Sequence, residues 1–185
     1  MNILDYVKKY SLPDGFIDIS FLTDGDWQYH NWYSRTPDNN DKTTIEKNDP
    51  LTNSICFEHT NNFVMPIVFK LIEEYAKEVG KFLTIQNASI PKLNSYSEKT
   101  FLKEHIDHIH DIFYDAPVYH RGVPVLSIIG NISKKKYEGG ELYVCGKDMN
   151  LKPGECIIFP SSFMYPHEVK PITSGIRDSF IIWAW

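Results

Sequence analysis

From Gly80 onwards, the sequence consists of short apolar stretches separated by turn-forming residues, a pattern that few folds accommodate. Gly139-Gly140, Pro153-Gly154 and Ser174-Gly175 provide turns between stretches rich in β-branched and aromatic residues. Many short strands, with helices confined to the first half, predict a mainly β fold with flanking helices. The leading candidate is a jelly-roll, cupin-like barrel. The predicted strands are Phe82–Gln86, Pro91–Tyr96, Phe101–Ile109, Val123–Ile132, Glu141–Val144, Glu155–Phe159, Met164–Lys170 and Ile176–Trp185.

One long helix is predicted in the first half of the chain, from about Val64 to Val79. Asn61 or Asn62 is the expected N-cap, Pro66 falls near the first turn, and Gly80 is expected to end the helix. The buried side of this helix is expected to comprise Val68, Leu71, Ile72, Tyr75 and Val79.

The segments before this helix are less regular. Ile3–Tyr10 places its apolar residues roughly on one stripe, which predicts a short helix, and the alternation in Trp27–Tyr33 predicts a strand. Ser34–Pro50 is almost wholly polar and rich in turn formers, so it is expected to form a loop. Two interpretations of this loop stay open, a plain surface loop and a lid over an active site. The length of 185 residues fits one domain better than two.

Charge and cysteine content exclude several classes of function. The net charge of -5 is unlike the basic patch expected of a nucleic-acid-binding protein. The three cysteines, Cys56, Cys145 and Cys156, are odd in number and show no CxxC spacing, which argues against a disulfide framework and a zinc site. The N-terminal residues lack the apolar core of a signal peptide, and no apolar run is long enough to cross a membrane. We therefore expect a soluble, cytoplasmic protein with reduced thiols.

The first candidate site lies in the predicted strand Phe101–Ile109. Residues two apart on a strand point to the same face, so His105 and Asp107 are expected to lie side by side. With a second histidine they match the 2-His-1-carboxylate triad of oxygen-activating Fe(II), which leaves metal positions open for other ligands. His108 and His110 form a competing pair on the opposite face, and their roles stay open.

Two downstream residues extend this candidate site. His167 is placed to supply the third ligand, and Arg177 follows it ten residues later. Strand alternation puts Arg177 and Ser179 on one face of the apolar terminal strand. A guanidinium buried there requires an anion, and its planar fork suits a carboxylate. A 2-oxo diacid fits, because its keto-acid end chelates iron while its distal carboxylate meets Arg177, with Ser179 as a further donor.

A string of motifs runs through the second half of the chain in a specific order. Its members are Asn94-Ser95-Tyr96, His105-Ile106-Asp107, Tyr137-Glu138-Gly139-Gly140-Glu141-Leu142, Pro153-Gly154, Phe159-Pro160-Ser161, His167-Glu168-Val169-Lys170-Pro171-Ile172 and Gly175-Ile176-Arg177. From about Ala88 to Trp185, the sequence resembles the 2-oxoglutarate/Fe(II) dioxygenase superfamily, in particular its prolyl 4-hydroxylase-like branch. The resemblance implies a double-stranded β-helix, with residues 86–185 as the catalytic barrel core and residues 1–85 as supporting structure.

The resemblance also implies roles for single residues. His105, Asp107 and His167 would bind Fe(II), and Arg177 would anchor 2-oxoglutarate. Tyr96 matches a tyrosine that often hydrogen-bonds the same carboxylate, and Ser127 lies where many relatives have a threonine near that group. Ascorbate is a further candidate cofactor.

The implied reaction is the hydroxylation of a C–H bond, with succinate and CO2 as co-products. The leading substrate is a prolyl residue in a peptide or protein, together with O2. Three alternatives stay open, namely a hydroxylase of a free amino acid or other small molecule, a cupin-like metal-binding protein without oxygenase activity, and a zinc-dependent hydrolase.

Two departures from the branch concern the site. Many prolyl 4-hydroxylases carry lysine where this chain has Arg177, although arginine is common elsewhere in the superfamily. Ile129-Gly130-Asn131 replaces a more usual Tyr-Leu-Asn, which thins the wall near the site. Neither the oligomeric state nor the position hydroxylated follows from the sequence.

Overall fold

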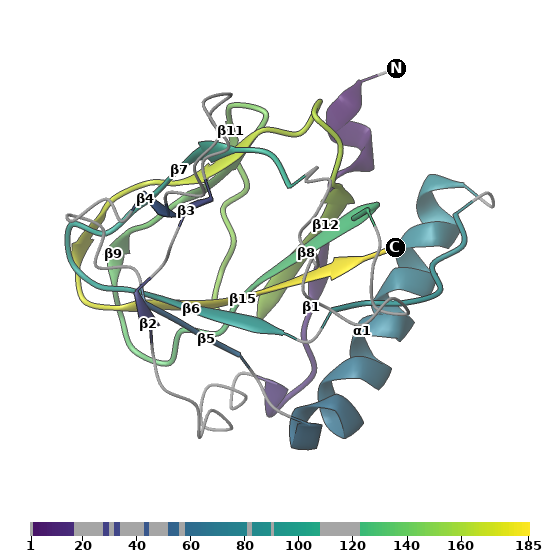
Figure 1. Ribbon diagram of the computed structural model, residues 1–185, viewed down its shortest axis with the longest axis horizontal. Helices are drawn as coiled ribbons and strands as arrows, with labels where there is room; N and C mark the ends of the chain where they lie inside the picture. Colours follow the sequence, from purple (N-terminus) through teal and green to yellow (C-terminus); the bar gives the residue numbers. More distant parts are fainter. Residues whose placement is uncertain are drawn as a thin grey trace.

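The computed structural model describes five stretches of the chain with their side chains, and a further five as backbone alone (Figure 1). The first group comprises residues 2–16, 63–80, 83–89, 91–107 and 123–185, and the second comprises 28–29, 32–33, 43–44, 52–55 and 58–62. His108, His110 and most of Ser34–Pro50 lie outside the described residues, so the open questions about this histidine pair and about a lid stay open.

Two antiparallel sheets form the body of the described structure. The major sheet has the strand order β1-β12-β8-β15-β6-β5-β2, and the minor sheet has the order β11-β10-β13-β7. The strands of the major sheet are β1 (Lys8–Ser11), β2 (Gln28–Tyr29), β5 (Thr52–Ile55), β6 (Lys92–Tyr96), β8 (Leu126–Asn131), β12 (Glu155–Pro160) and β15 (Arg177–Ala184). Those of the minor sheet are β7 (Leu102–His105), β10 (Leu142–Val144), β11 (Lys147–Asp148) and β13 (His167–Val169). Two small ribbons pair β9 (Glu138–Gly139) with β14 (Ile172–Ser174), and β3 (Trp32–Tyr33) with β4 (Thr43–Thr44).

Apolar side chains fill both faces of the major sheet. On one face, the helix α1 (Glu58–Val79) packs along the sheet, as Figure 1 shows. On the other face, the side chains meet those of the minor sheet. Strand alternation separates the two cores, because Phe180 and Ile182 of β15 belong to the first and Ile181 to the second. The predicted mainly β, double-stranded β-helix architecture is confirmed.

The helix α1 begins earlier than predicted. It starts at Glu58, so Asn61 and Asn62 lie inside it rather than capping it, and Pro66 lies in its interior rather than in its first turn. Extending an existing helix by further residues is favourable even where their intrinsic helix propensity is modest. The preference of Asn61 and Asn62 for an N-cap position therefore did not determine where the helix begins. The end at Gly80 is confirmed, where φ is +137°, and so is the burial of the central stripe residues. No described helix is long and apolar enough to span a membrane.

The N-terminal prediction was wrong in part. Ile3–Tyr6 forms a 3-10 helix (η1) closed by a capping box from Asn2, but Lys8–Ser11 leaves the helix and becomes β1. Pairing with β12 gives these residues backbone partners that an isolated helix end lacks. Phe82–Gln86 is also not the predicted strand, because its described residues lie outside any strand. The predicted strand Trp27–Tyr33 contains β2 and β3, the predicted Glu155–Phe159 matches β12 except for its last residue, and the other predicted strands contain β6, β7, β8, β10, β13 and β15.

Candidate metal and co-substrate site

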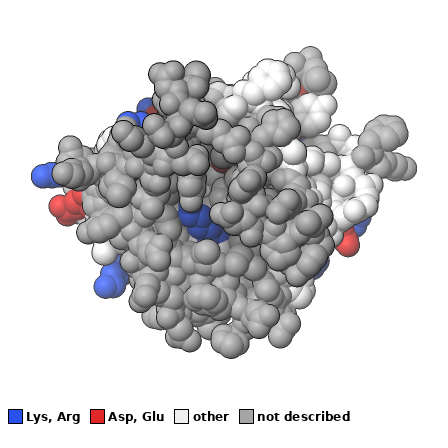
Figure 2. Space-filling view, in the orientation of Figure 1, with Lys and Arg blue, Asp and Glu red and all other residues white. Residues whose placement is uncertain are grey.

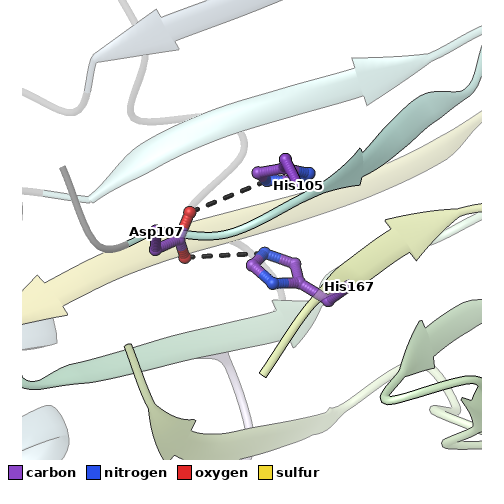
Figure 3. A group of neighbouring side chains, drawn as sticks. All are labelled: His105, Asp107 and His167. Carbon is purple, nitrogen blue, oxygen red and sulfur yellow. Dashed lines mark ion pairs between the residues drawn. The ribbon is translucent and has the colours of Figure 1, made fainter. Parts of the chain in front are cut away.

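Antiparallel pairing of β13 with β7 brings the two candidate histidines together. His167 is the register partner of His105, and Asp107 follows two residues after β7 ends (Figure 3). Asp107 lies between the two rings, with Oδ1 3.6 Å from His105 Nε2 and Oδ2 3.5 Å from His167 Nε2. The three ligand atoms all lie within 4.8 Å of one another, so one metal ion could contact all of them. The sequence-predicted triad is therefore assembled.

Hydrogen bonds behind the triad fix the direction of each ring. His105 Nδ1 donates to the carbonyl oxygen of Lys103 at 2.7 Å, and His167 Nδ1 donates to that of Tyr165 at 3.2 Å. A carbonyl only accepts, so both rings carry their proton on Nδ1 and present the Nε2 lone pair to Asp107. This is the arrangement that metal-binding histidines normally adopt.

The environment keeps the triad ready for a cation. Burial, followed by the neighbouring His167, lowers the pKa of His105 to about 4, so the imidazole is neutral at physiological pH. His167 is only 2% exposed, and its Nε2 has no hydrogen-bond partner among the described residues. A buried polar atom left without a partner is costly, and a metal ion at this point would satisfy it.

Two serines hold the carboxylate from behind. Ser127 Oγ donates to Asp107 Oδ2 at 2.7 Å, and because its only proton is used there, Ser161 Oγ, also at 2.7 Å, donates to Ser127. All three side chains are buried. Ser127 lies at the opposite end of β8 from Asn131, where its register partner on β15 is Trp183, and its role near the co-substrate carboxylate stays a prediction. Ser161 belongs to a motif of the resemblance, but no role was predicted for it.

Arg177 is the largest fully buried side chain among the described residues, with 1% exposure. It opens β15 opposite Tyr96 of β6, and its guanidinium lies 5.3 Å from the centre of the Tyr96 ring. Neither Nη1 nor Nη2 has a hydrogen-bond partner within the described part of the chain. A buried guanidinium without an anion is strongly unfavourable, and a carboxylate would match its two free nitrogen atoms. Ser179, two residues further along β15, is also buried and lies on the same face as Arg177.

A close approach of the backbone makes room for this arginine. Gly140 has φ of +69°, and a Cβ atom there would lie 2.9 Å from Arg177 Cδ and 2.3 Å from Ile172 Cδ1. Glycine is therefore required both for its conformation and for the space that the arginine side chain occupies.

Two polar residues of β6 also face the site and were missed. Lys92 and Asn94 alternate with Tyr96, so all three lie on one face of the strand. The signal was present in the predicted strand Pro91–Tyr96, because a lysine and an asparagine occupy the positions that share a face with the tyrosine.

Comparison with known proteins assigns the family. Residues 91–185 match the 2OG-Fe(II) oxygenase superfamily, which covers just over half of the chain. The chain belongs to this superfamily. Its co-substrate is therefore 2-oxoglutarate and its metal Fe(II), and the protein is a dioxygenase. The residues assembled above fit these groups, because they offer three converging metal ligands and an unpaired buried guanidinium. No match was found among curated proteins.

Solved structures of prolyl hydroxylases share the fold of this oxygenase. One from Trichoplax adhaerens, in complex with a hypoxia inducible factor peptide fragment, is 14% identical with a TM-score of 0.66, covering 98% of this chain and 84% of that one. A viral collagen prolyl hydroxylase from Paramecium Bursaria Chlorella virus-1 is 15% identical with a TM-score of 0.63, covering 97% and 94%. A Pseudomonas putida prolyl-4-hydroxylase is 18% identical with a TM-score of 0.57, covering 76% and 74%.

Proposed function

We propose that this dioxygenase hydroxylates a prolyl group, with His105, Asp107 and His167 as the iron ligands and Arg177 as the anchor of 2-oxoglutarate. Two observations carry the residue roles: three ligand atoms converge within 4.8 Å, and the buried guanidinium of Arg177 has no hydrogen-bond partner for Nη1 or Nη2 among the described residues. The prolyl group is supported by the shared fold with three prolyl hydroxylases. With iron and 2-oxoglutarate bound, the site supplies an oxygen-dependent oxidation that yields succinate and CO2 and hydroxylates a C–H bond.

Each residue of the chain contributes by position. The backbone carbonyls behind His105 and His167 orient the two rings, and Ser127 orients the carboxylate of Asp107. Arg177 fixes the distal end of the co-substrate, so that its keto-acid end points towards the triad. Apolar side chains of the second core line the rest of this face and exclude water from it.

The residue roles are tested by anaerobic titration of the metal-free protein with Fe(II) and 2-oxoglutarate, following the weak visible charge-transfer band of the chelate. We expect the wild type to form the band and His167→Ala to lose it. Arg177→Gln should form it only at much higher concentrations of 2-oxoglutarate. Glu168→Gln is a matched control, because Glu168 neighbours His167 in β13 but bonds Lys170 instead. A band of undiminished strength in His167→Ala would contradict the proposed ligand role.

A second measurement addresses the substrate. At least one prolyl compound, either free L-proline or a proline-containing peptide, should stimulate succinate formation by the wild type and gain 16 mass units from one oxygen atom, and Asp107→Ala should show neither effect. Stimulation by other compounds, with none by any prolyl compound, would remove the prolyl assignment and leave the oxygenase function intact.

A further inference from the structure

Two polar side chains of the site face have no role in holding iron or 2-oxoglutarate. The pairing of β6 with β15 places them in register, with Tyr96 opposite Arg177, Asn94 opposite Ser179, and Lys92 opposite Ile181. Register partners in an antiparallel pair point to the same face, so Lys92 and Asn94 share the face of Arg177. Lys92 lies four residues before Tyr96, the register partner of Arg177, which corresponds to about 13 Å along the strand. Figure 2 shows Lys or Arg atoms near the centre of the view.

Lys92 lies within electrostatic reach of the triad. Burial lowers the pKa of Lys92, and the negative charge of Asp107 acts in the opposite direction. No carboxylate of the described residues lies within 4.0 Å of its ammonium group, which would be needed for an ion pair. Lys92 is therefore a partly buried cation beside the metal site, without a partner in the described structure.

The expected cofactors do not neutralise this cation. Fe(II) brings two positive charges and 2-oxoglutarate two negative charges, and Arg177 and Asp107 add one of each sign. These charges balance without Lys92. Both anionic ends of 2-oxoglutarate are also already matched, one to Arg177 and the other to the metal. Among the described residues and these cofactors, the ammonium of Lys92 is left as an excess positive charge, and a partly buried cation is stabilised by an anion.

Asn94 adds a second unpartnered group beside this lysine. Its side chain is only 8% exposed, and Oδ1 is buried without a hydrogen-bond partner among the residues described. An amide oxygen accepts N–H or O–H donors, while an ammonium group donates to an anion. Together, the two side chains match a compound that carries a carboxylate and an N–H donor close to each other.

We propose that Lys92 and Asn94 form the subsite for the α-carboxylate and α-nitrogen of the substrate, so that the hydroxylated compound is a free amino acid rather than an internal residue of a peptide. This inference rests on the proposed oxygenase site and deepens it. With a prolyl ring, the substrate is L-proline itself. An internal prolyl residue has an amide in place of the carboxylate and would leave Lys92 unpaired, which selects against peptides.

The test compares L-proline with L-prolinamide, which differ only in the carboxylate. Binding is measured by calorimetry without oxygen, on protein loaded with Mn(II) and 2-oxoglutarate, so that the result does not depend on turnover. We expect the wild type to bind the acid about 10- to 100-fold more tightly than the amide, as for a charge-assisted hydrogen bond. Lys92→Met should lose this preference, and Lys92→Arg should retain much of it. The exposed Lys152→Met is the matched control and should behave as wild type.

Asn94→Leu separates the two contacts of the subsite. Because both ligands retain the amino group, this variant should bind the acid and the amide more weakly by the same factor. A wild type that binds both ligands equally, or a Lys92→Met protein that keeps its preference, would overturn the proposal. So would the absence of binding by L-proline and by the other free amino acids tested in the same way.

One further measurement separates this inference from the oxygenase function. The Fe(II)–2-oxoglutarate band of Lys92→Met should form at the same 2-oxoglutarate concentration as in the wild type. If Lys92→Met instead loses 2-oxoglutarate binding, the lysine serves the co-substrate and the subsite proposal fails, while the oxygenase site stands. If the wild type never forms the band, the oxygenase site itself fails. Circular dichroism confirms that each variant is folded.

Discussion

Replacing Ser127 by alanine should weaken metal binding although Ser127 is not itself a metal ligand. The substitution removes the 2.7 Å hydrogen bond to Asp107 Oδ2 and leaves a small buried gap. A hydrogen bond to a charged group contributes about 1.5–3 kcal/mol, which corresponds to about a 10- to 150-fold change in an equilibrium constant. Loss of a residue that orients a metal ligand typically lowers affinity about 10- to 100-fold, in agreement with that range.

The assay is a competition titration of Mn(II) or Fe(II) against a chelator of known affinity, without oxygen and at fixed pH. Ser161→Ala is an informative companion, because Ser161 reaches the carboxylate only through Ser127 and should have a smaller effect. Ser133→Ala is the control, since this buried serine bonds the backbone of Asp178 instead. The reasoning is refuted if Ser127→Ala binds metal as tightly as the wild type, or if Ser161→Ala loses as much affinity as Ser127→Ala.

Three further predictions concern stability and co-substrate binding. Gly130→Ala should lower the free energy of unfolding by about 1–3 kcal/mol in urea denaturation, because its Cβ would lie 2.0 Å from Phe180 Cε1; unchanged stability would show that the ring moves aside freely. Gly140→Ala should be destabilised similarly and should also bind 2-oxoglutarate more weakly, since its Cβ would displace Arg177; calorimetry with 2-oxoglutarate tests this, and wild-type affinity would contradict it. The pKa of His105 in the folded state is about 4, below its ordinary value of 6.5, so between these pH values the unfolded chain binds more protons than the folded protein. The metal-free protein should therefore lose stability as the pH falls from 6.5 to 4. His105→Gln should lose less over this range in urea midpoints, and an equal loss would argue against the shift.

The metal triad could be predicted because it depends on short-range rules. His105 ends β7 and Asp107 follows two residues later, so their short separation along the chain keeps the two side chains close. His167 needed one further step, the pairing of β13 with β7, and the ordered string of motifs supplied it. Arg177 followed in the same way from alternation within one apolar strand. Local sequence therefore predicted His105, Asp107 and Arg177, and the order of the motifs along the chain predicted His167.

The predictions failed where position depends on distant partners. Lys8–Ser11 is a strand only because the edge of β12 offers hydrogen bonds to it, and nothing within Ile3–Tyr10 encodes that edge. The hydrogen bond from Ser127 to Asp107 was not predicted, because it depends on how β8 is placed in the sheet, where Ser127 lies opposite Trp183 of β15. Register between strands far apart in sequence is a tertiary property, so a pattern within one strand does not reveal it.

The two faces of strand β15 have different roles in the protein. Arg177, Ser179 and Ile181 lie on the face that carries the candidate site. Phe180 and Ile182 lie on the opposite face and pack in the core that includes the helix α1. A systematic mutational scan of this strand should therefore alternate in the kind of damage it causes. Substitutions of the residues that face α1 would reduce the amount of folded protein. Substitutions of the residues on the opposite face would leave a folded but inactive enzyme. Selection can then act on substrate preference and on the stability of the fold almost independently within the single strand β15.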